Sequence, residues 1–256
     1  MNDAKIVLLA GEGLSTNILY HALKDEFAFH SIILEEPVGK KDLLKRRIKK
    51  LGLWRVTGQI LFQLIIAKFL RVFSAGRKRE ILEAYSLDAS PLPSEKITRV
   101  SSVNDDQCLE ILQRIAPQIV IVNGTRIISK RILEGVNATF INMHAGITPL
   151  YRGVHGAYWA LVNNDPENCG VTVHLVDAGI DTGDIIFQAT ITPGSRDNFV
   201  TYPLLQVAAG IPGMKYAIAE ILNERLVKTR GTGESKLWSH PGFVQYLYQR
   251  IIRNVK

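Results

Sequence analysis

Short apolar runs recur along the first 190 residues, and most are separated by stretches with helical periodicity. Runs of about five residues, rich in Val, Ile and Leu, are typical of buried parallel strands. The stretches between them repeat apolar residues every three or four positions, as amphipathic helices do. The expected strands cover residues 5–10, 31–35, 96–100, 118–122, 139–143, 170–176 and 184–191. This alternation predicts an α/β fold with a Rossmann-like, doubly wound and mostly parallel sheet.

The last two expected strands differ from the others. Residues 170–176 alternate apolar and polar positions, which is typical of a strand at a sheet edge. Residues 184–191 follow after a glycine-rich turn, so the two strands are expected to pair as a hairpin. Beyond them, one further helix is expected around residues 214–224. We therefore predict a main domain over residues 1–195 and a small C-terminal extension over residues 196–256.

Residues 38–85 interrupt the rhythm after the second strand. The stretch KKDLLKRRIKKLG is strongly basic, and helical periodicity continues to about Tyr85. A crossover of this length is unusual in such a fold and predicts an inserted helical subdomain. Three interpretations fit the pattern: an amphipathic helical pair packed on the sheet, a basic wall of a substrate pocket, or a contact with a membrane surface.

The net charge and the cysteines exclude few classes of function. An excess of +7 suits anionic ligands such as nucleotides, and it equally suits nucleic acid, an anionic membrane or no specific partner. Cys108 and Cys169 lack the spacing of a metal site and are expected to be reduced thiols. The first apolar run is too short for a signal peptide, and the most apolar stretch, residues 60–73, is too short for a membrane span. We expect a cytoplasmic protein.

Three polar residues stand where an open parallel sheet collects its ligands, at the carboxyl ends of strands. Asn142 and His144 end the strand at 139–143 and point the same way, and Asp181 lies in the turn between the last two strands. Singly, each has an ordinary explanation as a turn former, a structural histidine or an Asx turn. Together they provide what acyl transfer to an amine requires. His144 is the expected base, Asn142 the donor to the oxyanion, and Asp181 the carboxylate that fixes the imidazole tautomer.

The strings INMHAGITPLYRG and VDAGIDTGDII carry a family resemblance. They resemble the Asn-x-His and Asp-x-Gly signatures of the folate-dependent formyltransferases, with a similar spacing between His144 and Asp181. The resemblance covers residues 4–190 except for the insertion. It implies an enzyme that uses 10-formyltetrahydrofolate as co-substrate, with residues 1–195 as the catalytic domain. No metal is expected, because the histidines lack ligand spacing.

The resemblance also implies binding residues. In family members the pterin lies against backbone that corresponds here to the residues Arg126, Ile127, Ile128, Val176, Asp177 and Gly179. Ile127 and Ile128 equally suit an ordinary core. Gly11 and Gly13 precede a helix that could hold a phosphate, and we expect them to bind substrate. Tyr151 and Arg152 are further candidates, because an aromatic ring and a guanidinium suit a sugar or base and a diphosphate.

The string HAGITPLYRGVHGAYWAL is most similar to the sugar N-formyltransferase branch. This implies an amino group on a nucleotide-linked 4-amino-4,6-dideoxy sugar such as GDP-perosamine, in lipopolysaccharide O-antigen synthesis. It also implies that the protein is a homodimer. We expect no nucleic acid partner and no membrane contact. The alternatives are a glycinamide ribonucleotide formyltransferase, which usually has Ser-Leu-Leu-Pro in place of residues 146–149, and a methionyl-tRNA formyltransferase, which has a larger C-terminal domain. A non-catalytic folate-binding, nucleotide-binding or membrane-associated protein is the alternative of another class, and the retained catalytic residues argue against it.

Overall fold

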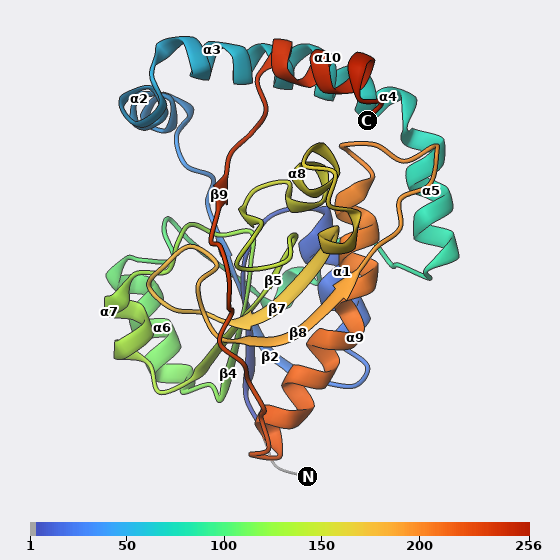
Figure 1. Ribbon diagram of the computed structural model, residues 1–256. Coiled ribbons are helices and arrows are strands. Elements are labelled where there is room, and N and C mark those ends of the chain that lie inside the picture. The colour runs from blue at the N-terminus through green and yellow to red at the C-terminus, as the bar shows by residue number, and fades with distance from the viewer. Residues whose placement is uncertain (1–3) are drawn as a thin grey trace.

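The computed structural model describes residues 4–256, except for the side chains of residues 40 and 42. One sheet has the strand order β3-β2-β1-β4-β5-β7-β8 (Figure 1). Its strands are β1 (Ile6–Gly11), β2 (Phe29–Glu35), β3 (Ile97–Val100), β4 (Ile119–Asn123), β5 (Thr139–His144), β7 (Gly170–Leu175) and β8 (Ile185–Thr190). Strands β1 to β5 are parallel, whereas β7 is antiparallel to β5 and β8 is antiparallel to β7. The predicted α/β, Rossmann-like and mostly parallel sheet is confirmed, and so is the hairpin of its last two strands.

Helices cover both faces of the sheet. They are α1 (Leu14–Leu23) and α9 (Tyr202–Leu222) on one face, and α6 (Asp106–Ile115) and α7 (Lys130–Gly135) on the other (Figure 1). Alternate residues of β1 enter the two cores, Ile6 and Leu8 on the α1 side and Val7 and Leu9 on the α6 side. Because both faces of this strand are buried, its sequence is a continuous apolar run.

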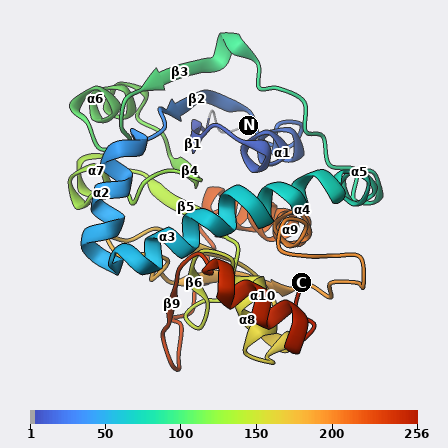
Figure 2. The same cartoon turned by 90° about the horizontal axis from the view of Figure 1, so that it is seen from above.

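The helical insertion predicted over residues 38–85 is present. It follows the carboxyl end of β2 and crosses the top of the molecule in Figure 1. Its elements are α2 (Lys40–Leu51), α3 (Leu53–Leu61), the π-helical turn η1 (Phe62–Ala67), α4 (Lys68–Phe73) and α5 (Ala75–Ala84). Helix α10 (Phe243–Ile252) lies beside α3 and η1 (Figure 2). Phe62 and Tyr246 are fully buried between them, with ring centroids 4.9 Å apart, so segments far apart in the sequence share one core.

Several short elements surround the carboxyl end of β5. They are the 3-10 turn η3 (Pro166–Asn168), helix α8 (Gly156–Val162), and strands β6 (Arg152–Gly153) and β9 (Leu237–Trp238). The 3-10 turn η2 (Ser94–Lys96) instead precedes β3 and contacts β2. Strands β6 and β9 pair as a separate two-stranded sheet. The C-terminal part of the chain is thereby joined to the segment that follows β5.

The expectation that β7 lies at a sheet edge is wrong. It lies between β5 and β8, and β8 is the edge strand. The polar residues that produce its alternating pattern, Thr172 and His174, are buried. The Thr172 hydroxyl donates to the Gly146 carbonyl at 2.8 Å. The alternation in this strand therefore reflects buried, hydrogen-bonded polar groups rather than a face in contact with water.

Helix α9 is longer than the sequence pattern predicts. It begins well before the expected residues 214–224 and contains Pro212 in its interior. Gly210 lets the helix approach the sheet, because an added Cβ would lie 2.3 Å from the sulfur of Met143. Packing on the sheet thus stabilises a segment whose proline and glycines predict a loop. The helix shares a core with β1 and α1, and the domain boundary after residue 195 stays a prediction.

Candidate active site

The three predicted catalytic residues lie together at the carboxyl end of β5. Asn142 and His144 are on the strand itself, and Asp181 is in the loop between β7 and β8. All three line a cleft of about 480 Å³, together with residues 124–128 after β4 and much of the loop 176–181. The structure thus brings the predicted groups together at the sheet edge where ligands of such folds collect.

The His144 imidazole is held between two oxygen atoms. The side chain is 6% exposed; its Nε2 lies 2.8 Å from the Tyr151 carbonyl oxygen and its Nδ1 lies 3.3 Å from Asp181 Oδ2. A carbonyl oxygen can only accept a hydrogen bond, so Nε2–H donates to it and Nδ1 of the neutral ring carries the lone pair. The Tyr151 carbonyl therefore selects the tautomer, a role that the sequence led us to expect of Asp181. Nδ1 is the atom that can take up a proton, beside a carboxylate that stabilises the resulting imidazolium.

The surroundings of His144 and Asp181 favour a neutral imidazole and an ionised carboxylate. Burial lowers the pKa of His144 below its ordinary value of 6.5, against the opposing effect of Asp181. Burial also disfavours ionised Asp181, but its polar contacts, among them the Gly153 amide that donates to Oδ2 at 2.9 Å, hold its pKa below the ordinary value of 3.8. At neutral pH the site therefore holds a neutral base beside an ionised carboxylate, as general-base catalysis requires.

The loop that carries Asp181 is closed by its own hydrogen bonds. Asp177 Oδ1 accepts from the Gly179 amide at 3.0 Å and from the Thr182 hydroxyl at 2.6 Å. Asp181 has a left-handed backbone with φ of 51°, which aspartate tolerates better than most residues. The sequence GIDTG thus places a carboxylate against His144 in addition to turning the chain.

His174 is a site residue that the sequence analysis missed. It faces Asn142 across the β5–β7 ladder, and the Asn142 Nδ2 donates to His174 Nε2 at 3.2 Å. The His174 Nδ1–H donates to the Leu175 carbonyl at 2.6 Å, which leaves Nε2 as the acceptor. The ring therefore fixes the orientation of the Asn142 amide. Since an amide nitrogen carries two hydrogens, one remains for an oxyanion in the cleft.

A signal for this contact was present in the sequence. Asn142 and His144 alternate on one strand, and Thr172 and His174 alternate on another, so an antiparallel pairing brings polar residues opposite each other. The sequence pattern does not specify the register, that is, which residues of the two strands lie opposite each other. A slip of one residue would turn His174 to the other face of the sheet, so only the folded chain shows the contact.

The predicted folate-binding residues all line the cleft: Arg126, Ile127, Ile128, Val176, Asp177 and Gly179. Ile127 is 53% exposed, whereas the Ile128 side chain is buried in the core below. The Arg126 guanidinium donates to the Glu36 and Ser101 carbonyls at 3.0 and 2.9 Å, so it stabilises the wall of the cleft. An exposed apolar side chain beside backbone amides has the chemistry that a flat heterocycle such as a pterin requires.

Tyr151 and Arg152, the predicted substrate residues in the segment after β5, lie in different surroundings. Tyr151 is buried and its hydroxyl donates to Asp165 at 2.8 Å, so only its carbonyl contacts His144. Arg152 lines a second hollow of about 220 Å³, which adjoins the cleft at Asp181 and also contains Arg230. Two guanidinium groups at one hollow suit a phosphate or diphosphate.

The two predicted glycines lie near the amino end of α1. Gly11 ends β1 against the Gly124 carbonyl, and an added Cβ there would come within 2.5 Å of that oxygen. Gly13 immediately precedes α1, and no atom crowds it. The close approach at Gly11 gives it a packing role, and the binding roles of both glycines stay predictions.

Metal and thiol chemistry find little support among the described residues. No group of three or more His, Cys, Asp or Glu is placed to hold a metal ion within residues 4–256. Cys108 and Cys169 are buried free thiols, and burial raises the pKa of each to about 12. Neither therefore forms the thiolate that nucleophilic catalysis needs.

Comparison with known proteins gives the family. Residues 70–199, about half of the chain, match the family described as "Formyl transferase", and this span contains Asn142, His144 and Asp181. The chain belongs to the formyl transferase family. Methionyl-tRNA formyltransferase from Finegoldia magna is 38% identical over 86 residues, which are 33% of this chain and 27% of that protein. The match thus spans about a quarter of that relative's length.

Solved structures of family members share the fold over most of this chain. A 4-N formyltransferase from Francisella tularensis has a TM-score of 0.57 and 15% identity, over 92% of this chain and 76% of that one. A formyltransferase from Anoxybacillus kamchatkensis, in complex with UDP-4,6-dideoxy-4-formamido-L-AltNAc and tetrahydrofolate, has a TM-score of 0.51 and 20% identity, over 97% and 92% of the two chains. At these identities the likeness establishes the fold.

Proposed function

We propose that this protein transfers the formyl group of 10-formyltetrahydrofolate to the amine of a nucleotide-linked 4-amino-4,6-dideoxy sugar. The observation that carries the proposal is the arrangement of His144 Nδ1, the Asn142 amide and the Asp181 carboxylate in one cleft. We include in it a homodimer and a role in lipopolysaccharide O-antigen synthesis, which follow from the family resemblance, and the cytoplasmic location expected from the apolar pattern of the sequence. GDP-perosamine is the first sugar nucleotide to test.

The catalytic groups have complementary roles in such a transfer. The bound co-substrate supplies a formyl carbon that is open to attack by an amine. The attacking amine loses a proton, which neutral His144 accepts at Nδ1, and Asp181 stabilises the positive ring. The Asn142 amide donates to the negative oxygen that develops at the attacked carbon. No serine or cysteine nucleophile is needed, because the amine of the substrate attacks directly.

The walls of the site support two different ligands. Residues 124–128 and 176–179 combine the exposed Ile127 with backbone polar groups and would hold the pterin of the folate. The second hollow, with Arg152 and Arg230, would hold the diphosphate of a sugar nucleotide. The two hollows meet at Asp181, so the two ligands would approach each other at the catalytic groups.

Methionyl-tRNA formylation is the second candidate. It is favoured by the curated relative described above, which is more similar in sequence over its matched segment than the solved structures are. The basic α2 would suit a polyanion as well. The two candidates share the folate and the chemistry, and they differ in the amine that the second hollow receives.

The test is a panel of amines incubated with the protein and 10-formyltetrahydrofolate, with release of tetrahydrofolate as the readout. The panel contains GDP-perosamine, UDP- and dTDP-linked 4-amino sugars, glycinamide ribonucleotide and methionyl-tRNA. The proposal expects turnover with a sugar nucleotide that is lost in His144→Ala. Turnover with methionyl-tRNA or glycinamide ribonucleotide alone would replace the sugar by that substrate, and no turnover with any amine would overturn the enzyme assignment.

A further inference from the structure

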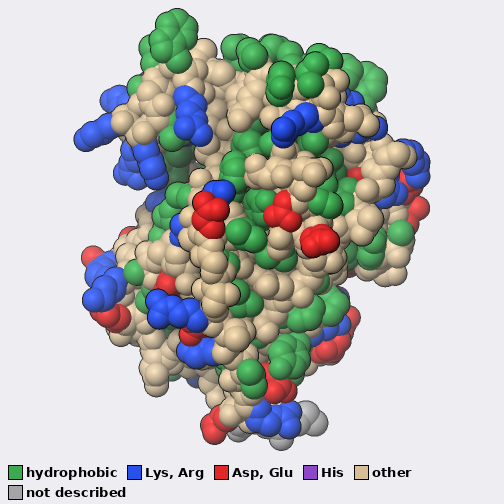
Figure 3. Space-filling model, in the orientation of Figure 1, with side chains coloured by type: hydrophobic (Ala, Val, Ile, Leu, Met, Phe, Trp, Pro, Cys, Tyr) green, Lys and Arg blue, Asp and Glu red, His purple; other side chains and the backbone are tan. Residues whose placement is uncertain are grey.

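Exposed apolar side chains gather on the outer side of the helical insertion and α10, on a surface named the apolar ridge. Its members are Leu53, Trp54, Leu61, Leu64, Ile65, Phe69, Val72, Phe73, Val244, Tyr248, Ile251 and Ile252. They are twelve of the twenty large apolar side chains that are exposed among the described residues. Figure 3 shows hydrophobic side chains along the upper edge of the molecule, where these helices run. Scattered exposed apolar residues are ordinary, but a gathered patch marks an interaction site.

Most of the ridge belongs to one helical run with two apolar faces. Residues 53–73 are helical throughout, and the π-helical turn η1 lies in the middle. The buried face consists of Val56, Gln59, Phe62, Ala67 and Leu70. These positions recur every three residues except across η1, where the spacing is five, and the π turn accommodates the extra residues and keeps the later positions facing the protein. The opposite face is held outward, although it is apolar as well.

Helix α10 extends the ridge. Val244, Tyr248 and Ile251 are spaced by four and three positions and are exposed on one side of the helix, whereas Tyr246 on the other side is buried. Because α10 lies beside α3 and η1, its exposed stripe widens the apolar surface of the insertion (Figure 2). Phe69 and Phe73 also contact each other on α4, with ring centroids 4.0 Å apart.

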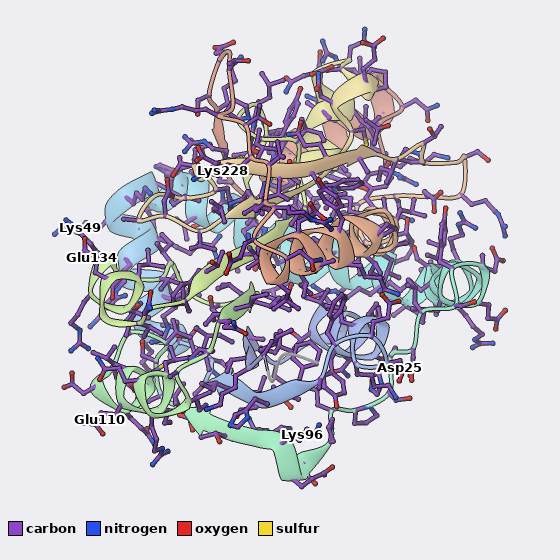
Figure 4. All side chains as sticks on the ribbon, turned by 90° about the horizontal axis from the view of Figure 1, so that it is seen from below. Asp25, Lys49, Lys96, Glu110, Glu134 and Lys228 are labelled. Carbon is purple, nitrogen blue, oxygen red and sulfur yellow. The ribbon has the colours of Figure 1, made fainter. Side chains whose placement is uncertain are left out.

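Positive charge accompanies the ridge. Residues 40–79 contain thirteen Lys and Arg and one acidic residue, whereas the rest of the chain contains eighteen basic and twenty-three acidic residues. The positive excess of the protein therefore comes entirely from the insertion. On α2, Lys45 and Lys49 are exposed, and Lys49 points away from the protein (Figure 4). An apolar stripe flanked by basic side chains complements an anionic lipid surface.

We propose that the apolar ridge and α2 bind the surface of an anionic lipid bilayer, with the apolar side chains in the headgroup and upper acyl region. The sequence left a membrane contact open as one of three interpretations of the insertion, and the resemblance led us to expect none. The folded chain changes that expectation, because it shows that the protein covers only one of the two apolar faces. Trp54, 89% exposed at one end of the ridge, has the amphipathic ring that favours this depth of a bilayer.

A bilayer fits the ridge better than the other possible occupants. The expectation that the apolar stretch of residues 60–73 is too short for a membrane span is wrong, because the helical run over residues 53–73 is long and apolar enough to cross one. One face of the run packs on the protein and Arg55, Lys68 and Arg71 are exposed along it, so it would lie in the plane of the surface. A second copy would bring two strongly basic insertions together, and like charges repel. Nucleic acid would satisfy the charge but leave the apolar side chains in water.

The buried face of the helical run that carries the ridge is connected to the cleft by hydrogen bonds. The Gln59 amide on α3 donates to the His240 carbonyl at 2.7 Å, and the His240 ring contacts His155 Nε2 at 2.9 Å. His155 lines the cleft. Bilayer binding would thus hold the cleft close to the membrane surface, and this consequence does not depend on which amine is formylated.

The test is co-sedimentation of the full chain with vesicles of phosphatidylcholine alone or mixed with phosphatidylglycerol. We expect binding to the anionic vesicles that weakens at high salt, and a blue shift of tryptophan fluorescence that Trp54→Phe abolishes. Trp54→Ser with Phe69→Ser should lower the partition coefficient at least about tenfold, whereas the matched surface variant Val227→Ser should leave it unchanged. Removing two charges with Lys45→Gln and Lys49→Gln should weaken binding roughly 25-fold, at about fivefold per lysine.

The controls separate this inference from a loss of fold and from the proposed enzyme activity. Arg114→Gln with Lys130→Gln removes the same charge from α6 and α7 and should bind vesicles like the wild type. All variants should keep the thermal transition of the wild type. No binding to anionic vesicles would overturn the inference, as would a dimer that dissociates in the Trp54 and Phe69 variant, or binding to tRNA in place of vesicles. Vesicle binding without formyl transfer would leave it intact while removing the proposed function.

Discussion

Replacement of His174 by alanine removes the acceptor that holds the Asn142 amide, and we expect this change to lower turnover while leaving KM nearly unchanged. The hydrogen bond between Asn142 Nδ2 and His174 Nε2 is 3.2 Å long and lies inside the protein. This bond holds the amide in the orientation that the transition state needs, and losing its net contribution of about 1 kcal/mol from the transition state corresponds to about fivefold in rate. The predicted loss in kcat is therefore about five- to tenfold.

The size of the loss in kcat distinguishes a residue that positions Asn142 from one that acts on the substrate directly. Truncation of the amide itself in Asn142→Ala should cost about 10²–10³ in kcat, the range for a lost oxyanion donor. If His174 acts only through Asn142, the double variant should be no slower than Asn142→Ala alone. His174→Gln keeps a side-chain oxygen that can accept from the amide, so it should recover much of the rate.

The assay is tetrahydrofolate release under saturating and limiting substrate, with a thermal melt on each variant. Three results would refute the reasoning. They are a kcat within twofold of wild type in folded His174→Ala, additive losses in the double variant, or a loss confined to KM. Because His174 is buried, the melt also separates a positioning role from plain destabilisation, which His174→Gln should largely avoid.

Four further predictions concern the same site. His144→Ala should lose at least about a hundredfold in turnover while far-UV circular dichroism is unchanged, and near-wild-type turnover would remove its role as base. Because burial lowers the pKa of His144 below 6.5, the ring is neutral at pH 7, and kcat/KM should begin to fall only when the pH drops below 6.5. A fall of kcat/KM with decreasing pH that begins above pH 6.5 would contradict the assignment. Asp181→Asn should slow turnover by about 10²-fold or more, since the imidazolium loses its counter-charge, and it should leave the alkaline side of the pH profile unchanged. A change in KM alone would count against this role. Gly146→Ala should impair both folding and turnover, measured by melt and by rate, because its Cβ would lie 2.2 Å from the Tyr151 carbonyl oxygen and 2.7 Å from His144 Nε2; a fully active, stable variant would show that the His144 tautomer does not depend on that carbonyl.

The strands of the parallel sheet and the cleft position of Asn142 and His144 could be predicted from the sequence for a physical reason. Strands such as β1 and β4 are buried on both faces, so burial leaves a continuous apolar run that no other short element requires. The ends of such strands collect ligands, and alternation along an extended chain places Asn142 and His144 on one side. Local pattern and spacing are enough for these features.

Other features depend on contacts that local pattern does not encode. The polar residues of β7 looked like an exposed edge until Thr172 and His174 were seen to be hydrogen-bonded inside the protein. The proline in α9 predicts a loop, and packing on the sheet stabilises a helix there. The Tyr151 side chain, expected at the substrate, lies in the core, while its carbonyl orients the His144 ring.

The sequence by itself determined that the chain forms an α/β sheet, where its ligand edge lies, and which three groups are proposed to carry the chemistry, because each depends on residues close together in the chain or at a strand end. Only the tertiary structure decided the register that pairs His174 with Asn142, because a strand carries no record of its partner. It also decided which apolar face of residues 53–73 is covered. Both faces are apolar in the sequence, and packing against Tyr246 buries one and leaves the apolar ridge exposed.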